Sequence, residues 1–302
     1  MKKRTKIILA LLLILLIIAS YFAYQQKFFI KMAMVPLSTY TPTEIPKDST
    51  ETFVARGNMD NKEAFIYVQG GPNYVLFSDS FNPLLEIENS DNLLKIYPQQ
   101  SQIINTSAFA AKPTLTKEQA IYELKQSVEL LSRTIAYFKN RDKKVYVICH
   151  SYGSEIGLEY LLNKINKADK FVLMGLNLDM DLKNIDAIKK GKIIIWEDGV
   201  NPIEQDPFPG FLMETSLKEK FTNMSMLMLN GEKRFTELLS DVDLSNVVYV
   251  YGESDASVGR PKQYEIDFLK SKSVEVIKLD GGHMSMWTPE FMNKLYKNIT
   301  KE

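Results

Sequence analysis

The chain has 302 residues with 37 basic and 37 acidic side chains, so its formal net charge is zero. A neutral chain lacks the basic surface that nucleic-acid binding requires, so we expect no nucleic-acid partner. Two histidines and one cysteine make no metal-ligating motif, and no glycine-rich phosphate loop follows a strand. We therefore expect no metal and no cofactor.

The N-terminal residues 1–26 predict a membrane anchor. Four basic residues among the first six precede residues 7–26, which contain no charged side chain. Twenty helical residues span about 30 Å, enough to cross a bilayer, and the positive-inside rule puts the basic end in the cytoplasm. We expect a single-pass protein of the cell membrane with an extracytoplasmic domain. A cleaved signal peptide and secretion are the alternative, which Ala19 and Ser20 favour and the aromatic residues after them disfavour.

Three prolines among serines and threonines follow in residues 27–51, a composition that predicts an extended spacer. From residue 52 to residue 302, strand-like apolar runs alternate with helical patterns such as 116–139. About 250 residues are enough to bury one large core. This alternation predicts an α/β fold with a doubly wound, mostly parallel sheet.

A strand, a sharp turn and a helix are predicted around Ser151. The β-branched run 145–148 precedes the serine, and the helical pattern 154–162 follows it. Small residues two positions before and after a serine allow a tight turn that lifts its hydroxyl above the sheet. Gly153 meets this requirement and Cys149 nearly does, so we interpret Cys149 as a buried small residue rather than a redox group.

A serine hydroxyl becomes a nucleophile only when a base takes its proton and a carboxylate orients that base. His150 is adjacent to Ser151, so we expect its side chain to point away from the hydroxyl. His283, in a loop after the predicted strand 274–279, is then the base, and Asp255, directly after the predicted strand 246–250, is the acid. Each alone has an ordinary structural explanation, but the three at strand ends in this order predict a catalytic triad.

On these motifs, residues 53–299 resemble the α/β-hydrolase family. The matching pieces are Cys149–Gly153 for the nucleophile elbow, Tyr251–Asp255 for the acid loop and Gly281–His283 for the histidine loop. The resemblance implies a serine hydrolase that cleaves an ester or amide bond through an acyl-enzyme on Ser151. A carboxylesterase or lipase-like enzyme and a peptidase both stay open.

A fourth piece, residues 65–72, looks like the oxyanion loop of the prolyl-iminopeptidase-like branch of this family. That branch usually has histidine where Gln69 stands. Backbone N–H groups must point at the oxygen that becomes negative, and the amides of Gly71 and Tyr152 are the candidates. The turn at 98–102 also departs from the branch, so an aminopeptidase specificity is not carried over.

The resemblance further implies a cap insertion at about 177–243. Met224, Met226 and Met228 could line an adaptable apolar pocket there, or could merely attach the cap to the core. Two other function classes stay open: an acyltransferase on lipid or envelope substrates, suggested by the anchor, and a non-catalytic binding scaffold. The expected substrate is a small acyl ester or a peptide.

Overall fold

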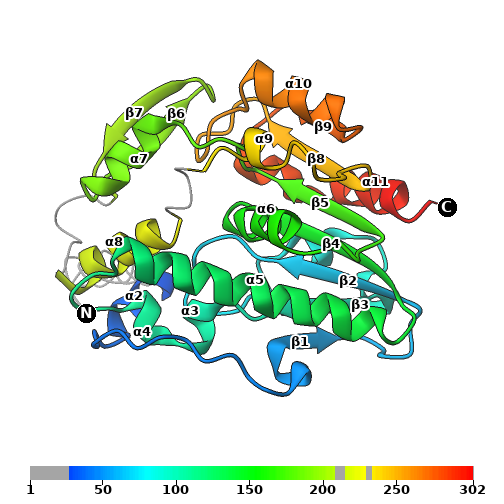
Figure 1. The fold of residues 1–302 in the computed structure, drawn as a ribbon, viewed down its shortest axis with the longest axis horizontal. Coiled ribbons are helices and arrows are strands. Elements are labelled where there is room, and N and C mark those ends of the chain that lie inside the picture. Colours follow the sequence, from blue (N-terminus) through cyan, green and yellow to red (C-terminus); the bar gives the residue numbers. More distant parts are fainter. Residues whose placement is uncertain (1–26, 208–214, 229–232, 302) are drawn as a thin grey trace, which may run out of the picture.

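The computed structural model describes residues 27–207, 215–228 and 233–301, and its centre is one seven-stranded sheet (Figure 1). The strand order is β1-β3-β2-β4-β5-β8-β9. Only the edge strand β1 runs antiparallel to its neighbour, and the other pairings in this sheet are parallel. The strands are β1 (Phe53–Arg56), β2 (Glu63–Val68), β3 (Leu94–Pro98), β4 (Lys144–His150), β5 (Lys170–Met174), β8 (Val247–Gly252) and β9 (Glu275–Leu279).

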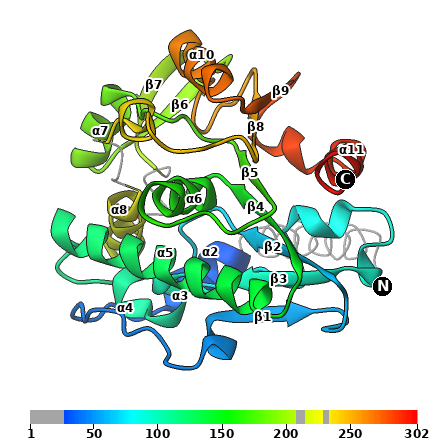
Figure 2. The same ribbon diagram turned by 45° about the vertical axis from the view of Figure 1, so that its right-hand side comes forward.

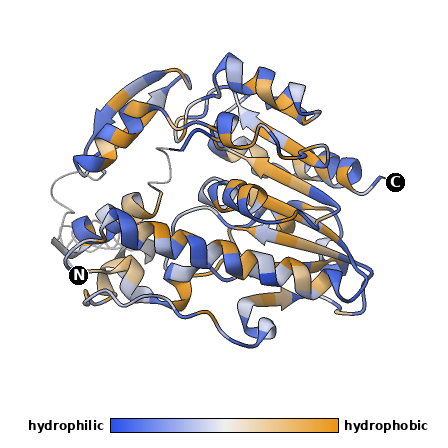
Figure 3. Ribbon diagram, in the orientation of Figure 1, coloured by the Kyte–Doolittle hydropathy of each residue, from blue (hydrophilic) through white to orange (hydrophobic). Residues whose placement is uncertain are grey.

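Helices cover both faces of this sheet (Figures 1 and 2), as the sequence predicts for a doubly wound fold. Side chains alternate along β2, so Ile66 packs toward α5 and α6 while Phe65 packs toward α11. Figure 3 shows the resulting apolar strands between layers of mixed polarity. The helices around the sheet are α3 (Ser101–Ile104), α4 (Thr106–Phe109), α5 (Lys117–Lys139), α6 (Tyr152–Asn163), α10 (Gln263–Ser271) and α11 (Pro289–Ile299).

The strand order reverses beside β2. From β2 the chain moves to β3 on one side and then returns to β4 on the other, so β2 lies between them. Ligands of open α/β sheets bind outside the carboxyl ends of the strands at such a reversal. The loop after β2 and the turn after β4 meet at this point, and they carry Gly71 and Ser151.

Residues 27–51 differ from the predicted extended spacer. Lys27–Met34 form helix α2, and the segment packs onto the domain. Met32 is fully buried beside Phe109, and the backbone N–H and hydroxyl of Thr43 both donate to the buried carboxylate of Glu123. Residues 35–48 contain one isolated bridge and no helix or strand, and their docking depends on partners far away in sequence.

The predicted anchor and its cytoplasmic end, residues 1–26, lie outside the described residues. Within the part of the chain that is described, no helix combines the length and the apolar character needed to cross a bilayer. The anchor and the extracytoplasmic location therefore stay predictions.

Between β5 and β8 the chain forms an insertion, in the region predicted as a cap. It contains α7 (Leu182–Lys189), β6 (Ile193–Glu197), β7 (Asn201–Gln205), α8 (Thr215–Leu227) and α9 (Phe235–Leu238). Strands β6 and β7 pair with each other in a separate antiparallel hairpin. Helix α8 is fixed to the body by Asn223, whose amide group bonds the backbone of Phe109, Ala111 and Leu115.

Candidate active site

Ser151 lies in a sharp turn between β4 and α6. Its φ of 54° is unusual for a residue with a side chain, and its backbone N–H donates to Met174 O at 2.8 Å. A Cβ on Gly153 would lie 2.1 Å from Val68 O, so only glycine lets α6 start this close to the end of β2. Cys149 is buried, and burial raises the pKa of its thiol, which fits a structural residue. The local geometry is that of the predicted elbow.

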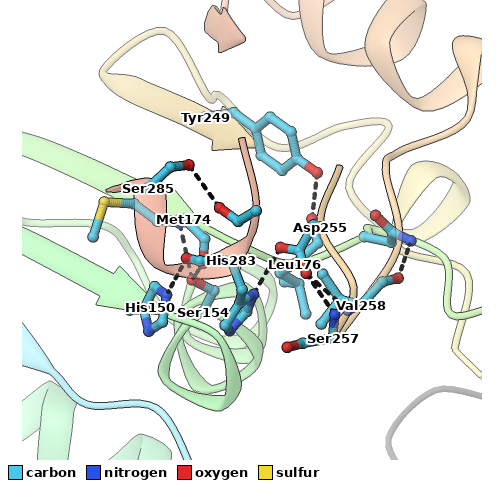
Figure 4. A network of polar contacts seen from close by, with 12 residues as sticks. His150, Ser154, Met174, Leu176, Tyr249, Asp255, Ser257, Val258, His283 and Ser285 are labelled. Carbon is cyan, nitrogen blue, oxygen red and sulfur yellow. Dashed lines mark hydrogen bonds and ion pairs between the residues drawn. The ribbon is translucent and has the colours of Figure 1, made fainter. Parts of the chain in front are cut away.

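Asp255 and His283 are joined by a short hydrogen bond, as Figure 4 shows. His283 Nδ1 lies 2.7 Å from Asp255 Oδ2, while Asp255 Oδ1 accepts the backbone N–H groups of Ser257 at 2.8 Å and Val258 at 3.1 Å. Both oxygens of the carboxylate therefore accept hydrogen bonds, and the residue is only 1 % exposed. A carboxylate oxygen accepts, so the proton of this bond lies on His283 Nδ1, and Nε2 is the nitrogen left for a second partner.

Space for the His283 ring comes from Gly175, directly after β5. A Cβ on Gly175 would lie 2.9 Å from His283 Cε1, and the φ of this residue is +63°. We did not predict this residue as part of the site. A glycine immediately after a central strand was the available signal, but only the folded chain shows which ring it accommodates.

Ser151 and His283 line one cavity of about 230 Å³ at the carboxyl end of the sheet. Gly70 and Gly71 from the loop after β2 also line it, and a Cβ on Gly70 would lie 3.1 Å from the Cβ of Ser151. The described lining residues are Tyr67, Gln69, Gly70, Gly71, Asn73, Phe77, Phe81, His150, Ser151, His283, Met284 and Trp287. The structure thus brings one oxyanion candidate, Gly71, into the cavity, and the other, Tyr152, is the first residue of α6.

Gln69, the first residue after β2, holds the loop that follows this strand with its side chain. Its side-chain amide donates to Val75 O and accepts from Phe77 N, each at 2.8 Å. Gln100, in the turn after β3, donates to Gln69 O at 2.8 Å. Gln69 and Gln100 therefore supply hydrogen bonds that fix the loop containing Gly70 and Gly71.

His150 also lines the cavity, where its ring packs between those of His283 and Trp287. The ring centroids of His150 and His283 are 4.6 Å apart, and His150 Nε2 lies 3.4 Å from His283 O. Since a carbonyl oxygen only accepts, this contact requires the proton on Nε2 of His150. Burial, followed by the charge of His283, lowers the pKa of His150 to about 3. His150 is therefore neutral at pH 7, and the hydrogen bond to Asp255 belongs to His283.

The lowered pKa of His150 predicts a loss of stability in mild acid. The unfolded chain binds a proton at residue 150 below its ordinary value of 6.5, whereas the folded chain does not until about 3. Stability is complete above pH 6.5 and falls as the pH decreases toward 3, by about 1.4 kcal/mol at pH 5.5. Urea unfolding at pH 7.5 and 5.5 should show this loss in the wild type and lack it in His150→Gln. Equal pH dependence in the two proteins would contradict the assignment.

The insertion does not contribute to this cavity within the described residues. Met224 packs beside Met32 and Phe109. Met226 and Met228 both pack against the core between the sheet and helices α5 and α6, and Met226 also packs beside Ile185 of α7. Within the described residues, the three methionines contact core side chains and are not among those that line the cavity. The alternation of methionines at 224, 226 and 228, at the end of α8 and just beyond it, does not indicate which neighbours they meet.

An aminopeptidase would need an acidic side chain beside the cavity to bind the ammonium group of its substrate. Glu155, Glu197, Asp198 and Glu204 are not among the described residues that line the cavity. Glu204 pairs with Lys190 at 3.1 Å on the insertion, and Glu197 and Asp198 are exposed there.

Comparison with known proteins agrees with this architecture. No protein-family profile and no curated protein sequence matches the chain. Among solved structures, a lipase-esterase related protein from Clostridium acetobutylicum has a TM-score of 0.53 at 13 % identity, covering 82 % of this chain and 98 % of its own. An α/β hydrolase enzyme from a deep-sea metagenome library has a TM-score of 0.53 at 15 % identity, with coverages of 83 % and 94 %.

A third structure, the 2-hydroxy-6-oxo-6-phenylhexa-2,4-dienoate hydrolase of a Rhodococcus strain, has a TM-score of 0.51 at 15 % identity, with coverages of 82 % and 93 %. At these identities the likeness concerns the fold. The chain has the α/β-hydrolase fold, as its sequence motifs predict.

Proposed function

We propose that this protein is a serine hydrolase that cleaves an ester bond through an acyl-enzyme on Ser151. The observation that carries the proposal is the bond of 2.7 Å between His283 and the buried Asp255, because the His283 imidazole lines the same cavity as Ser151. Ser151 occupies a strained turn, the kind of backbone that persists where function requires it.

In the proposed mechanism, Ser151 Oγ attacks the substrate carbonyl while His283 Nε2 accepts its proton. Asp255 keeps His283 in the required tautomer and stabilises the imidazolium. The backbone N–H groups of Gly71 and Tyr152 bind the developing oxyanion. His283 then donates its proton to the leaving group, and a water molecule activated by His283 releases the acyl group from Ser151.

An ester with an apolar group fits the cavity better than a free-amine peptide. Phe77, Phe81, Met284 and Trp287 supply apolar walls, and none of the described lining residues is acidic. Phe81 is 72 % exposed and has a φ of 51°, so an exposed ring is held at the cavity in an unfavourable backbone conformation. A substrate ammonium would need a carboxylate partner, whereas an apolar acyl chain gains about 0.8 kcal/mol for each buried CH₂.

The test uses the purified full-length chain, a fluorophosphonate and a substrate series. We expect one covalent adduct on Ser151. We also expect p-nitrophenyl butyrate to give a higher kcat/KM than the acetate, with aminoacyl anilides turned over far more slowly. Absence of an adduct would contradict the serine mechanism, and a preference for aminoacyl anilides would replace the ester proposal with a peptidase.

We propose further that the domain is anchored in the membrane and faces away from the cytoplasm. The support is the uncharged stretch of residues 7–26 after a basic start. A membrane-impermeant fluorophosphonate should then label Ser151 in intact cells. Labelling only after lysis would contradict this orientation.

A further inference from the structure

The insertion hairpin, residues 193–205, contacts the loop that carries Asp255. This loop, residues 253–262, is the acid loop. Trp196 N donates to Ala256 O and Arg260 N donates to Gly199 O, each at 2.9 Å. The two bonds flank residues 257–259, and the first two of these donate their N–H groups to Asp255 Oδ1. The hairpin therefore bonds both ends of the segment that fixes the carboxylate.

Packing between the hairpin and this loop is close enough to require glycine on both sides. A Cβ on Gly199, which has a φ of +73°, would lie 2.4 Å from Glu253 O and 3.3 Å from Asp255 N. On the other side, a Cβ on Gly259 would lie 2.8 Å from the indole ring of Trp196. The ring lies against the loop backbone and is 7 % exposed. The turn of the hairpin is thus seated directly on the backbone around Asp255.

Beside these contacts, the hairpin and the acid loop are separated by a cavity. This cavity has a volume of about 630 Å³, and its walls come from α7, the hairpin, β9 and the acid loop. An ion pair between Lys262 and Asp181, at 3.0 Å, also links α7 to the end of the acid loop. The Lys262 side chain is half exposed, and ion pairs of that kind contribute little. Among the described residues, Trp196 and Gly199 supply the backbone bonds and close packing between the hairpin and the acid loop, and Asn177 Nδ2 separately donates to Val258 O at 2.9 Å.

We propose that Trp196 is a positioning residue. Its ring, packed on Gly259, holds the acid loop against the hairpin, and this keeps Asp255 aligned with His283. The inference deepens the proposed function and rests on it, because alignment matters only if His283 is the base. In this arrangement the insertion stabilises the loop that carries Asp255, and its described residues do not cover Ser151.

The structure supplies a matched pair of variants. Trp196 Nε1 is buried and bonds no group in the described part of the chain, so Trp196→Phe keeps an aromatic ring against Gly259 and breaks no hydrogen bond. Trp196→Ala removes the ring. Ile203→Ala, on the paired strand of the same hairpin and 47 % exposed, controls for a general effect of mutating the hairpin.

In the full-length protein we expect Trp196→Ala to lower kcat about 10-fold to 100-fold with KM changed less than threefold, because a misplaced group costs rate rather than binding. Trp196→Phe and Ile203→Ala should keep at least a third of the wild-type kcat. In an Asp255→Asn background, Trp196→Ala should lower kcat by less than threefold, since the group that it positions is already disabled.

Amide hydrogen exchange of residues 253–260 gives a readout that does not need activity. Exchange in this loop should be faster in Trp196→Ala than in Trp196→Phe, whereas exchange in the strands of the sheet should be the same in both variants. If Trp196→Ala fails to fold, Gly199→Ala tests the same contact, because its Cβ pushes against Glu253 O and should produce the same kinetic and exchange pattern.

Three results would overturn the proposal: wild-type kcat and exchange in Trp196→Ala, equal losses in the phenylalanine and alanine variants, or full additivity with Asp255→Asn. A wild-type protein without a fluorophosphonate adduct would instead contradict the proposed function. Faster exchange in Trp196→Ala would in that case still show that the hairpin holds the acid loop.

Discussion

Replacing Ser151 with alanine is expected to abolish ester turnover while leaving the protein folded. Loss of the nucleophile in a serine triad lowers kcat by roughly 10⁶-fold. The Ser151 side chain makes no capping hydrogen bond to α6, so its removal should leave the helix start and the unfolding midpoint unchanged. The measurement is kcat with the preferred ester, together with thermal unfolding and fluorophosphonate labelling.

Ser154 provides the matched control, because it lies one helical turn further along α6 and has a different role. Its hydroxyl donates to Met174 O at 2.9 Å and accepts from Met174 N at 3.0 Å, both in the buried core. Ser154→Ala should cost about 1–3 kcal/mol of stability while retaining the covalent adduct on Ser151. Turnover that survives in Ser151→Ala would refute the assigned nucleophile, whatever happens in Ser154→Ala.

The sequence could propose three triad residues because each of them follows a strand in a short local pattern. Ser151 needs a glycine two residues later, and Asp255 and His283 follow apolar strands of ordinary length. Parallel strands bring their carboxyl ends to one edge, so chain order alone places such residues near each other. The confirmed α/β-hydrolase fold follows from the same alternation of strands and helices.

Other features depend on contacts between distant segments, and sequence patterns carry little information about those. Gly175 accommodates the His283 ring from a strand more than a hundred residues earlier. The docking of Thr43 on Glu123 turns the predicted spacer into part of the domain. Met224 has the same local pattern whether it faces a pocket or a core, and only its neighbours decide between these.

His150 illustrates how an adjacent residue can belong to a site without sharing its chemistry. Both histidines of the chain line the cavity, and sequence alone separates them only through the expected direction of the side chains. The structure adds a physical distinction. One ring bonds a buried carboxylate, whereas the other bonds a backbone carbonyl and is kept neutral by burial.

Replacing Asp255 with asparagine should lower kcat by a factor on the order of 10⁴ without unfolding the protein. An asparagine Oδ1 can still accept the N–H groups of Ser257 and Val258, so the acid loop keeps its bonds. Its NH₂ group then faces His283 Nδ1, at the position where Oδ2 now accepts. A donor there favours the tautomer with the proton on Nε2, which cannot take the proton of Ser151.

Asp280→Asn is the control, because it makes the same change of charge three residues before His283 on an exposed side chain. We expect it to reduce kcat less than threefold. The rate of fluorophosphonate labelling should fall with kcat in Asp255→Asn, since both require an activated Ser151. If Asp255→Asn labels and turns over at the wild-type rate, the Asp255–His283 bond is structural and the triad assignment is wrong. Because the hairpin acts through this bond, the Asp255→Asn effect also sets the upper limit for any loss that Trp196→Ala can cause.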